Sequence, residues 1–230
     1  YHSNKFTWIG SIDQAPALCM AWHTSPVQTW QDLREKEFVV GGTGVGSSML
    51  IYPAMLNATV GTKFKVIAGY ADGSSVYLAM ERGEVQGACG AFLTTIKATL
   101  PEWVSGHKFV VPIVIAPHRL ADFPDTPAIA ELIDDERTRQ VFAIPFAIEQ
   151  MDRPVLAPPA LPDERTRDLR QAFVATMTDA GFREEAERLR LTINYVDGEH
   201  LAEIIKSVYQ LPPDAIAVAR QSMGNEAAAD

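Results

Sequence analysis

Short apolar runs alternate with glycine-containing turns through the first half of the chain. Runs rich in β-branched and aromatic residues, which favour strands, occupy residues 6–11, 17–23, 37–40, 63–68, 85–89 and 107–116. Segments with apolar residues at helical spacing follow several of these runs and occupy residues 29–33, 49–56, 76–83 and 93–100. The repetition of strand, short turn and helix predicts right-handed βαβ units and an α/β fold with a parallel sheet.

The second half of the chain is predicted to be mainly helical. Helical segments cover residues 128–133, 163–177, 182–189, 199–209 and 213–223, and strand-like runs cover residues 141–148, 154–157 and 192–196. The isolated strands need partners, so we expect residues 6–23 and 142–158 to cross between two lobes as hinge strands. Two lobes joined by two crossovers form a clamshell.

We therefore predict four successive parts. Residues 1–23 form a remnant of lobe 1 and the first hinge strand, residues 24–142 form lobe 2 with a glycine-rich ligand loop, residues 143–158 form the second hinge strand, and residues 159–230 form the C-terminal helical part of lobe 1. Within lobe 2, the proline-rich residues 117–127 are a surface connection.

The stretch from Glu37 to Asn57 holds the most distinctive pattern of the chain. A buried-strand run is followed by glycines at positions 41, 42, 44 and 46, which let the backbone adopt positive φ, and then by Ser47 and Ser48 as N-cap candidates. A helix that begins there would direct unpaired N–H groups and a partial positive charge over the turn, which favours an anion. The alternative is a tight strand-to-helix connection that serves packing alone.

Two nucleotide-binding motifs do not fit this turn. A phosphate-binding P-loop needs Lys and then Ser or Thr after its last glycine, whereas the first lysine after Gly46 is Lys63. A dinucleotide fingerprint would need a glycine in place of Ser47 and an acidic residue about twenty positions later. The sequence reads KFKVIAG in that region.

Two further turns follow predicted strands, at residues 69–75 and 89–92. Ser74 or Ser75 would cap the helix after the first of them, and Gly90 would form the second. The carboxyl ends of parallel strands meet at one edge of a sheet, where ligands collect. We therefore expect these two turns and the glycine-rich turn to converge on one site.

The composition is that of an ordinary globular protein, with 230 residues of which 47% are hydrophobic and 21% charged. The formal net charge is −9 without a basic run, which argues against nucleic acid or an anionic membrane surface as a partner. Aimed amides act at hydrogen-bond range, whereas scattered surface carboxylates are screened beyond about 10 Å, so this charge does not exclude a local anion site.

The sequence contains no apolar window of roughly twenty residues, so we expect no direct membrane insertion. No signal peptide precedes Tyr1, and the chain starts without methionine. We therefore expect a processed or truncated product.

The two cysteines, Cys19 and Cys89, are too few for a disulfide framework and lack the spacing of a metal site. We expect two separate buried thiols, with a single bridge as the alternative. Cys89 beside Gly90 is also a candidate nucleophile for a small-molecule enzyme, assisted by a histidine at position 2, 23, 107, 118 or 200. Because no histidine neighbours a cysteine in a known motif and no G-x-S-x-G elbow is present, we predict no catalytic residue, no metal and no cofactor.

Several motifs occur in the order found in one family of receptors. They are Y-x-x-x-x-F-x-x-I (Tyr1, Phe6, Ile9), the GTGVGSS turn, the GYADGSS turn with LAMERGEVQGACG, the DFPDTPAIAEL connection, the RPVLAPPALP crossing and the final helices. Over nearly all of its length the chain resembles the Bug-type extracytoplasmic solute receptors of tripartite tricarboxylate transporters. The resemblance implies a two-lobe fold like that of type II periplasmic binding proteins, a periplasmic location, transporter membrane components as partners, and no catalysis.

The resemblance also implies how a ligand is held. The family's ligand is usually a small carboxylate in a cleft, bound by backbone amides and small polar side chains. Gly42–Ser48 resembles the carboxylate loop, and Gly69–Ser75 stands where the family has a Tyr-Lys-Gly turn, with Tyr70 matching and Ala71 in place of lysine. The first loop also lacks the histidine that the family commonly has after the polar residues. The predicted ligand-binding residues are Gly42, Thr43, Gly44, Val45, Gly46, Ser47, Ser48, Tyr70, Asp72, Gly73, Ser74, Gly90, Phe92 and Thr94.

The family's first lobe begins with a strand and a second glycine-rich loop, which would precede Tyr1. The resemblance therefore implies an incomplete first lobe, weakened binding and exposed apolar surface through which a homodimer could form. The remaining alternative is the effector-binding domain of a transcription regulator, which shares the two-lobe architecture. Such regulators carry a basic helix-turn-helix segment, which this acidic chain lacks.

Overall fold

The computed structural model of the chain describes residues 2–189 and 191–222 and divides into two compact units. Unit 1 comprises the described residues of Tyr1–Ala15 and Ala143–Leu211, and unit 2 comprises those of Pro16–Phe142 and Pro212–Asp230. Each unit is therefore built from segments that lie far apart in the sequence.

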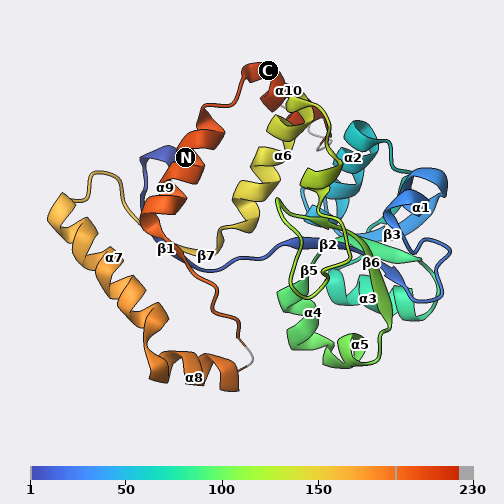
Figure 1. Cartoon of the computed structure of the whole chain (residues 1–230), viewed down its shortest axis with the longest axis horizontal. Helices are drawn as coiled ribbons and strands as arrows, with labels where there is room; N and C mark the ends of the chain where they lie inside the picture. Colours follow the sequence, from blue (N-terminus) through green and yellow to red (C-terminus); the bar gives the residue numbers. More distant parts are fainter. Residues whose placement is uncertain (1, 190, 223–230) are drawn as a thin grey trace. The chain divides into compact units, whose positions relative to one another are not determined.

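Unit 2 is built on a five-stranded sheet with the strand order β4-β3-β5-β2-β6 (Figure 1). Its strands are β2 (Ala17–Trp22), β3 (Phe38–Gly42), β4 (Phe64–Ala68), β5 (Gly87–Phe92) and β6 (Phe109–Ile115). β3 pairs in parallel with β4 and β5, whereas β2 is antiparallel to both β5 and β6. The sheet is therefore mixed, and the prediction of a parallel sheet is wrong for β2. Because β2 begins directly after the chain enters this unit, no crossover helix precedes it to fix its direction.

Helices cover both faces of the sheet in unit 2. They are α1 (Trp30–Glu35), α2 (Ser48–Val60), α3 (Gly73–Glu81), α4 (Leu93–Thr99), α5 (Pro101–Ser105), the 3₁₀ helix η2 (Ile129–Leu132) and α10 (Pro213–Ser222). A Cβ added to Gly41 would meet Val76 of α3 at 2.6 Å. A Cβ added to the next residue, Gly42, would meet Leu50 of α2 at 2.6 Å. Neighbouring strand residues point to opposite faces, so α3 and α2 lie on opposite sides of β3, as Figure 1 shows.

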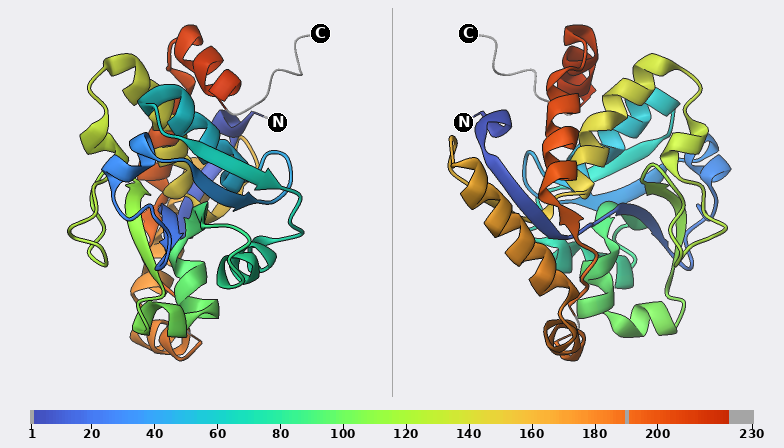
Figure 2. Two further views of the ribbon diagram at one scale, coloured as in Figure 1. Left: turned by 90° about the vertical axis from the view of Figure 1, so that its right-hand side faces the viewer. Right: turned by 60° about the vertical axis from the view of Figure 1, so that its left-hand side comes forward.

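Unit 1 is built on a three-stranded sheet with the order β7-β1-β8. Its elements are η1 (Ser3–Lys5), β1 (Thr7–Asp13), β7 (Asp152–Ala157), α7 (Asp163–Thr178), α8 (Ala180–Arg188), β8 (Val196–Asp197) and α9 (Gly198–Tyr209). Ile9 of β1 packs with Phe173 of α7, whereas the preceding Trp8 packs with Leu201 of α9. α7 and α9 therefore lie on opposite faces of β1 (Figure 2).

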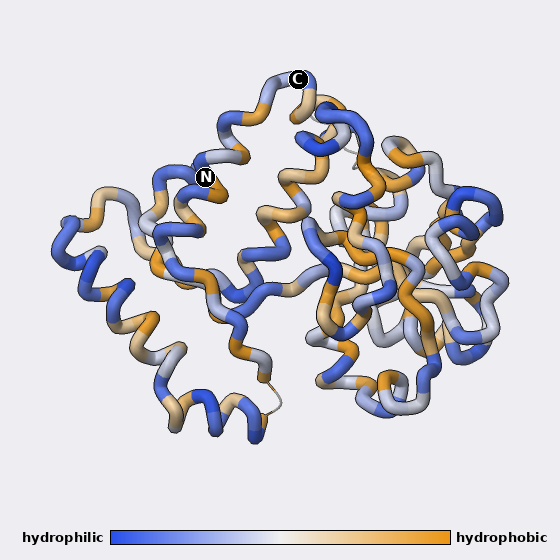
Figure 3. Tube along the Cα trace, viewed as in Figure 1, coloured by the Kyte–Doolittle hydropathy of each residue, from blue (hydrophilic) through white to orange (hydrophobic). Residues whose placement is uncertain are grey.

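The distribution of apolar residues follows these two sheets. In unit 2, β2 and β5 are buried along almost their whole length, and Figure 3 shows hydrophobic stretches running through this sheet. In unit 1, α7 alternates between hydrophilic and hydrophobic positions (Figure 3), as expected for a helix with one buried face.

Helix α6 (Glu136–Glu149) corrects the predicted strand at residues 141–148. The run VFAIPFAI is apolar almost throughout, and periodicity alone cannot distinguish a buried strand from a buried helix in such a run. The helix begins after Asp135, whose carboxylate accepts a hydrogen bond from the amide of Thr138 at 2.8 Å. The first part of the predicted second hinge strand is therefore helical, and β7 follows it.

One strand boundary also differs from the prediction. Of the strand expected at residues 192–196, only Val196 belongs to β8, which ends at Asp197 and pairs with Gly10 and Ser11 of β1. α10 begins at Pro213 as predicted and is described as far as Ser222. Met223, the predicted end of that helix, and Tyr1 of the first motif lie outside the described residues.

Candidate anion-binding site at the start of helix α2

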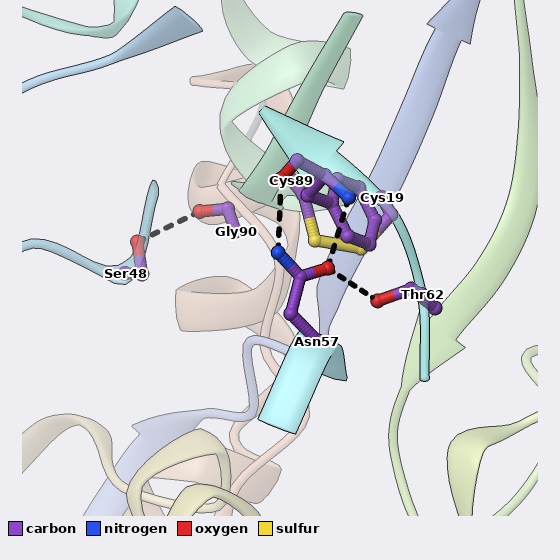
Figure 4. The surroundings of a disulfide bond; sticks show 7 residues. Cys19, Ser48, Asn57, Thr62, Cys89 and Gly90 are labelled. Carbon is purple, nitrogen blue, oxygen red and sulfur yellow. Dashed lines mark hydrogen bonds between the residues drawn. A yellow bond between two sulfur atoms is a disulfide. The ribbon is translucent and has the colours of Figure 1, made fainter. Parts of the chain in front are cut away.

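The loops that follow β3 and β4 meet the end of β5 at one edge of the sheet in unit 2. The amide of Tyr70, after β4, donates a hydrogen bond to the carbonyl of Gly42 at the end of β3 (3.2 Å). The hydroxyl of Ser48, at the start of α2, donates to the carbonyl of Gly90 in β5 (2.8 Å; Figure 4). The structure therefore brings the three predicted segments together, as expected for strands whose carboxyl ends share an edge.

The glycine-rich loop between β3 and α2 is buried at its base and exposed at its tip. Gly42 is buried, Thr43 is half-buried, and Gly44, Val45 and Gly46 are exposed. Val45 is 95% exposed although it is apolar. Cβ atoms added to Gly44 or Gly46 would meet nothing within 4 Å. Packing among the described residues therefore does not explain the shape of this tip.

Ser47 occupies the N-cap position of α2, but its side chain does not cap the helix. Its carbonyl accepts hydrogen bonds from the amides of Leu50 and Ile51, each at 3.0 Å. Its Oγ is buried and has no hydrogen-bond partner among the described residues. The amides of Ser48 and Met49 belong to the first helical turn, which has no intrahelical acceptor for them. Together these donors lie at the positive end of a 13-residue helix, an arrangement suited to an anion.

The second loop places the carboxylate of Asp72 at the start of α3. Asp72 accepts hydrogen bonds from the amide and the hydroxyl of Ser75, at 2.8 and 2.9 Å, and these bonds lower the pKa of its carboxyl. Asp72, and neither Ser74 nor Ser75, is therefore the cap of this helix. A Cβ added to Gly73 would lie 3.5 Å from the Met49 side chain, so the second loop adjoins the start of α2. The ionised Asp72 disfavours a second negative group of a ligand on this side.

Gly90 lies inside β5 and does not form the predicted turn. Cys89 and Ala91 pair with two successive residues of β2, so Gly90 between them is an extra residue, a β-bulge, with φ of +96°. A Cβ added to Gly90 would lie 2.5 Å from the carbonyl carbon and oxygen of Ser48. Only glycine allows β5 and α2 to approach this closely.

The other predicted residues differ in what they contact. Tyr70 is half-buried and packs against the apolar core of unit 2, so its backbone rather than its ring joins the loops. Phe92 and Thr94 are half-buried at the start of α4. Ser74 is exposed and lines a hollow of about 240 Å³ beside Tyr77. The donors suited to an anion therefore come mainly from the first loop.

Sequence reasoning placed Ser48 among the ligand contacts but missed its hydrogen bond to Gly90. The two residues are separated by 42 positions. No local pattern around either residue indicates the other, because their contact depends on how β5 and α2 pack.

Cys19 and Cys89 form a disulfide, so the prediction of two separate thiols is wrong. They are 70 residues apart in the sequence, but β2 and β5 pair side by side and place them opposite each other. Both residues are fully buried in the sheet, beside the Ser48–Gly90 contact (Figure 4). A bonded sulfur is not a thiolate, so the alternative of a Cys89 nucleophile loses its reactive group.

The candidate site contains no positively charged side chain. The three loop segments at 41–48, 69–75 and 89–94 contain no Lys, Arg or His. Within residues 2–189 and 191–222, no three His, Cys, Asp or Glu side chains are grouped so as to hold a metal ion.

None of the described helices has both the length and the apolar character needed to cross a bilayer.

No protein-family model and no curated protein matches the sequence. The solved structures that are similar in fold include a TctC solute binding protein from Polaromonas (TM-score 0.66, 19% identity), an R. palustris protein with adipate (0.60, 13%) and the periplasmic binding protein BugD (0.57, 18%). Each match covers 96% of this chain, and the matches cover 69%, 69% and 70% of the other chains. This similarity confirms the predicted α/β fold of the type II periplasmic binding protein class.

Proposed function

We propose that the protein is an extracytoplasmic solute-binding receptor of the Bug and TctC type, which binds a small carboxylate and delivers it to the membrane components of a tripartite transporter. The fold shared with a TctC solute binding protein and with the periplasmic binding protein BugD supports a periplasmic receptor. The adipate named for the R. palustris structure is itself a carboxylate. These neighbours favour a receptor over the effector-binding domain of a transcription regulator.

The buried hydroxyl of Ser47 carries the carboxylate assignment. A buried polar atom without a partner costs about 1 to 3 kcal/mol, so a ligand oxygen that accepted this hydrogen bond would recover that cost. The first-turn amides of Ser48 and Met49 would supply further donors to the same group. Because all of these donors are neutral, the site would recognise a carboxylate by hydrogen bonds and helix dipole rather than by an ion pair.

The other predicted site residues receive different roles in this proposal. The glycines at 42, 44 and 46 shape the loop so that a ligand can reach its backbone. Thr43 and Val45 are part of that loop. Asp72, Gly73 and Ser74 border the site at the start of α3, and Phe92 and Thr94 border it at the start of α4.

Calorimetric titration of the full chain with acetate, succinate, adipate and citrate tests the proposal. Ser47→Ala should weaken binding of the responding acid about tenfold, because one buried donor to a charged group is worth about 1.5 kcal/mol. Without ligand the same variant should be at least as stable as the wild type, because it removes a buried hydroxyl that has no hydrogen-bond partner among the described residues. Gly44→Val should also weaken binding, because its side chain would occupy the open space over the loop.

Ser105→Ala is the matched control, because Ser105 is an exposed serine in α5. It should bind the acid as the wild type does. If none of the four acids binds to the chain, the carboxylate assignment is wrong. If an amide or aromatic ligand binds instead, and Ser47→Ala weakens it, the loop is the site and only the ligand class changes.

A further inference from the structure

We propose that the Cys19–Cys89 disulfide is a positioning element of the ligand loop. It holds the β-bulge at Gly90 in register, and the bulge in turn holds the first turn of α2 through Ser48. This inference rests on the proposed function, because it assigns to residues outside the loop a part in setting its affinity. It differs from the ordinary role of a disulfide, which is to stabilise the folded chain as a whole.

The register of β5 against β2 changes at the disulfide. Before Gly90 in the chain, Cys89 lies opposite Cys19, and after it Ala91 lies opposite Leu18. Gly90 is therefore the single extra residue of β5 at this point, with φ of +96°. A bulge of this kind bends the strand and redirects its peptide groups, and a slip by one residue would move it along the strand. The bond at Cys89, directly beside the bulge, prevents such a slip.

The redirected peptide group is the one that meets α2. The carbonyl of Gly90 accepts the hydroxyl of Ser48 at 2.8 Å (Figure 4). The Cα of Gly90 lies so close that an added Cβ would be 2.5 Å from the Ser48 carbonyl and 2.8 Å from the Met49 amide nitrogen. The start of α2 therefore rests directly on the bulge, with little space for either to move alone.

This contact adjoins the proposed ligand donors. Ser47 precedes Ser48, and the amides of Ser48 and Met49 are themselves proposed donors. A displaced Gly90 carbonyl would release the Ser48 side chain and let the first turn of α2 shift. Hydrogen bonding to an anion depends strongly on donor direction, so such a shift would reduce affinity even in a chain that stays folded.

A thermodynamic cycle tests the proposal. Its variants are the double variant Cys19→Ala with Cys89→Ala, the single variant Ser48→Ala, and the triple variant that combines them. Affinity for the responding acid of the four named above is measured by calorimetry at a temperature where circular dichroism shows every variant folded. We expect the double variant and Ser48→Ala each to weaken binding about tenfold, and the triple variant to be no weaker than either.

Ile115→Val is the matched control for general loss of stability. Ile115 is fully buried in β6 of the same sheet, and β6 pairs with β2 rather than with β5. It should destabilise the chain without changing affinity. The inference is wrong if the double cysteine variant binds the acid as tightly as the wild type. It is also wrong if the fold-loss in affinity of the triple variant equals the product of the losses in the double cysteine variant and in Ser48→Ala, because the disulfide then does not act through Ser48.

Amide hydrogen exchange tests without a ligand whether the disulfide holds the first turn of α2. The amides of Leu50 and Ile51, which bond to the Ser47 carbonyl, should exchange at least several-fold faster in the double cysteine variant. The amide of Lys63, which bonds to Leu33 at 2.8 Å in the same unit, should exchange as in the wild type. If the wild type binds none of the acids, the proposed function fails, and this exchange pattern alone then decides the inference. Equal acceleration at all three amides would show a general loss of stability and would overturn it.

Discussion

Gly90→Ala probes the close approach of β5 to α2. With φ of +96°, an L residue at this position costs about 1 to 2 kcal/mol in backbone energy. The added Cβ would also lie 2.5 Å from the Ser48 carbonyl and 2.8 Å from the Met49 nitrogen, which are backbone atoms that no rotamer change can move. Overpacking of this kind costs about 1 to 3 kcal/mol. We therefore expect Gly90→Ala to lower the free energy of unfolding by about 2 to 5 kcal/mol.

Substitutions at two other glycines of the same site separate the backbone cost of positive φ from the steric cost of the added Cβ. Gly46 also has positive φ, +83°, but a Cβ there would meet nothing within 4 Å. Gly46→Ala should therefore show only the backbone cost of about 1 to 2 kcal/mol. Gly44 has neither a positive φ nor a neighbour within 4 Å, so Gly44→Ala should change stability by less than about 0.5 kcal/mol.

Equilibrium unfolding in urea, followed by far-UV circular dichroism, measures all three variants. The slope of the free energy against urea should be unchanged, so that midpoint shifts report stability directly. If Gly90→Ala is no less stable than Gly46→Ala, the start of α2 does not rest on the bulge. That result would also remove the contact on which the positioning role of the disulfide depends.

Two further predictions concern unit 1. Burial raises the pKa of the Asp13 carboxyl, the charge of Asp152 adds to this effect, and the charge of Arg153 opposes it. The Asp13 carboxyl therefore stays protonated to a higher pH in the folded chain than in the unfolded chain. The free energy of unfolding should therefore fall as pH rises from the ordinary carboxyl pKa to the raised pKa of Asp13. Asp13→Asn should remove this fall and be more stable than the wild type at pH 7, as measured by urea unfolding between pH 3 and 7. If the variant shows the same pH dependence as the wild type, the assignment to Asp13 is wrong. We also propose that the exposed apolar surface of unit 1 forms a homodimer through β7, an edge strand on which Leu156 is 43% exposed. Sedimentation velocity should show a concentration-dependent dimer for the wild type and a monomer for Leu156→Lys, and identical behaviour of the two would rule out this surface.

Local signals in the sequence were sufficient for most individual elements. Thr29 caps α1 in a capping box with Asp32, as the Thr and the following apolar spacing indicate. The strand and the helix on either side of the glycine-rich turn also lie where they were predicted, because strand propensity and helix initiation are properties of neighbouring residues. The turn itself is shorter than predicted, since Gly41 and Gly42 belong to β3 and only Gly46 of the four glycines has positive φ. The segment at 141–148 was mistaken for a strand because its apolar run gives no periodicity, although the cap at Asp135 was available as a signal.

The sequence by itself determined the α/β class, the order of most elements and the loop with its small polar residues, since each depends on contacts within a few positions of the chain. Only the tertiary structure decided which residues the loop rests on. The direction of β2, the bulge at Gly90, the bond between Cys19 and Cys89 and the contact with Ser48 all arise from pairing between residues at least 42 positions apart. Such pairing is set by how strands and helices pack into one sheet, and no pattern within either segment encodes its partner.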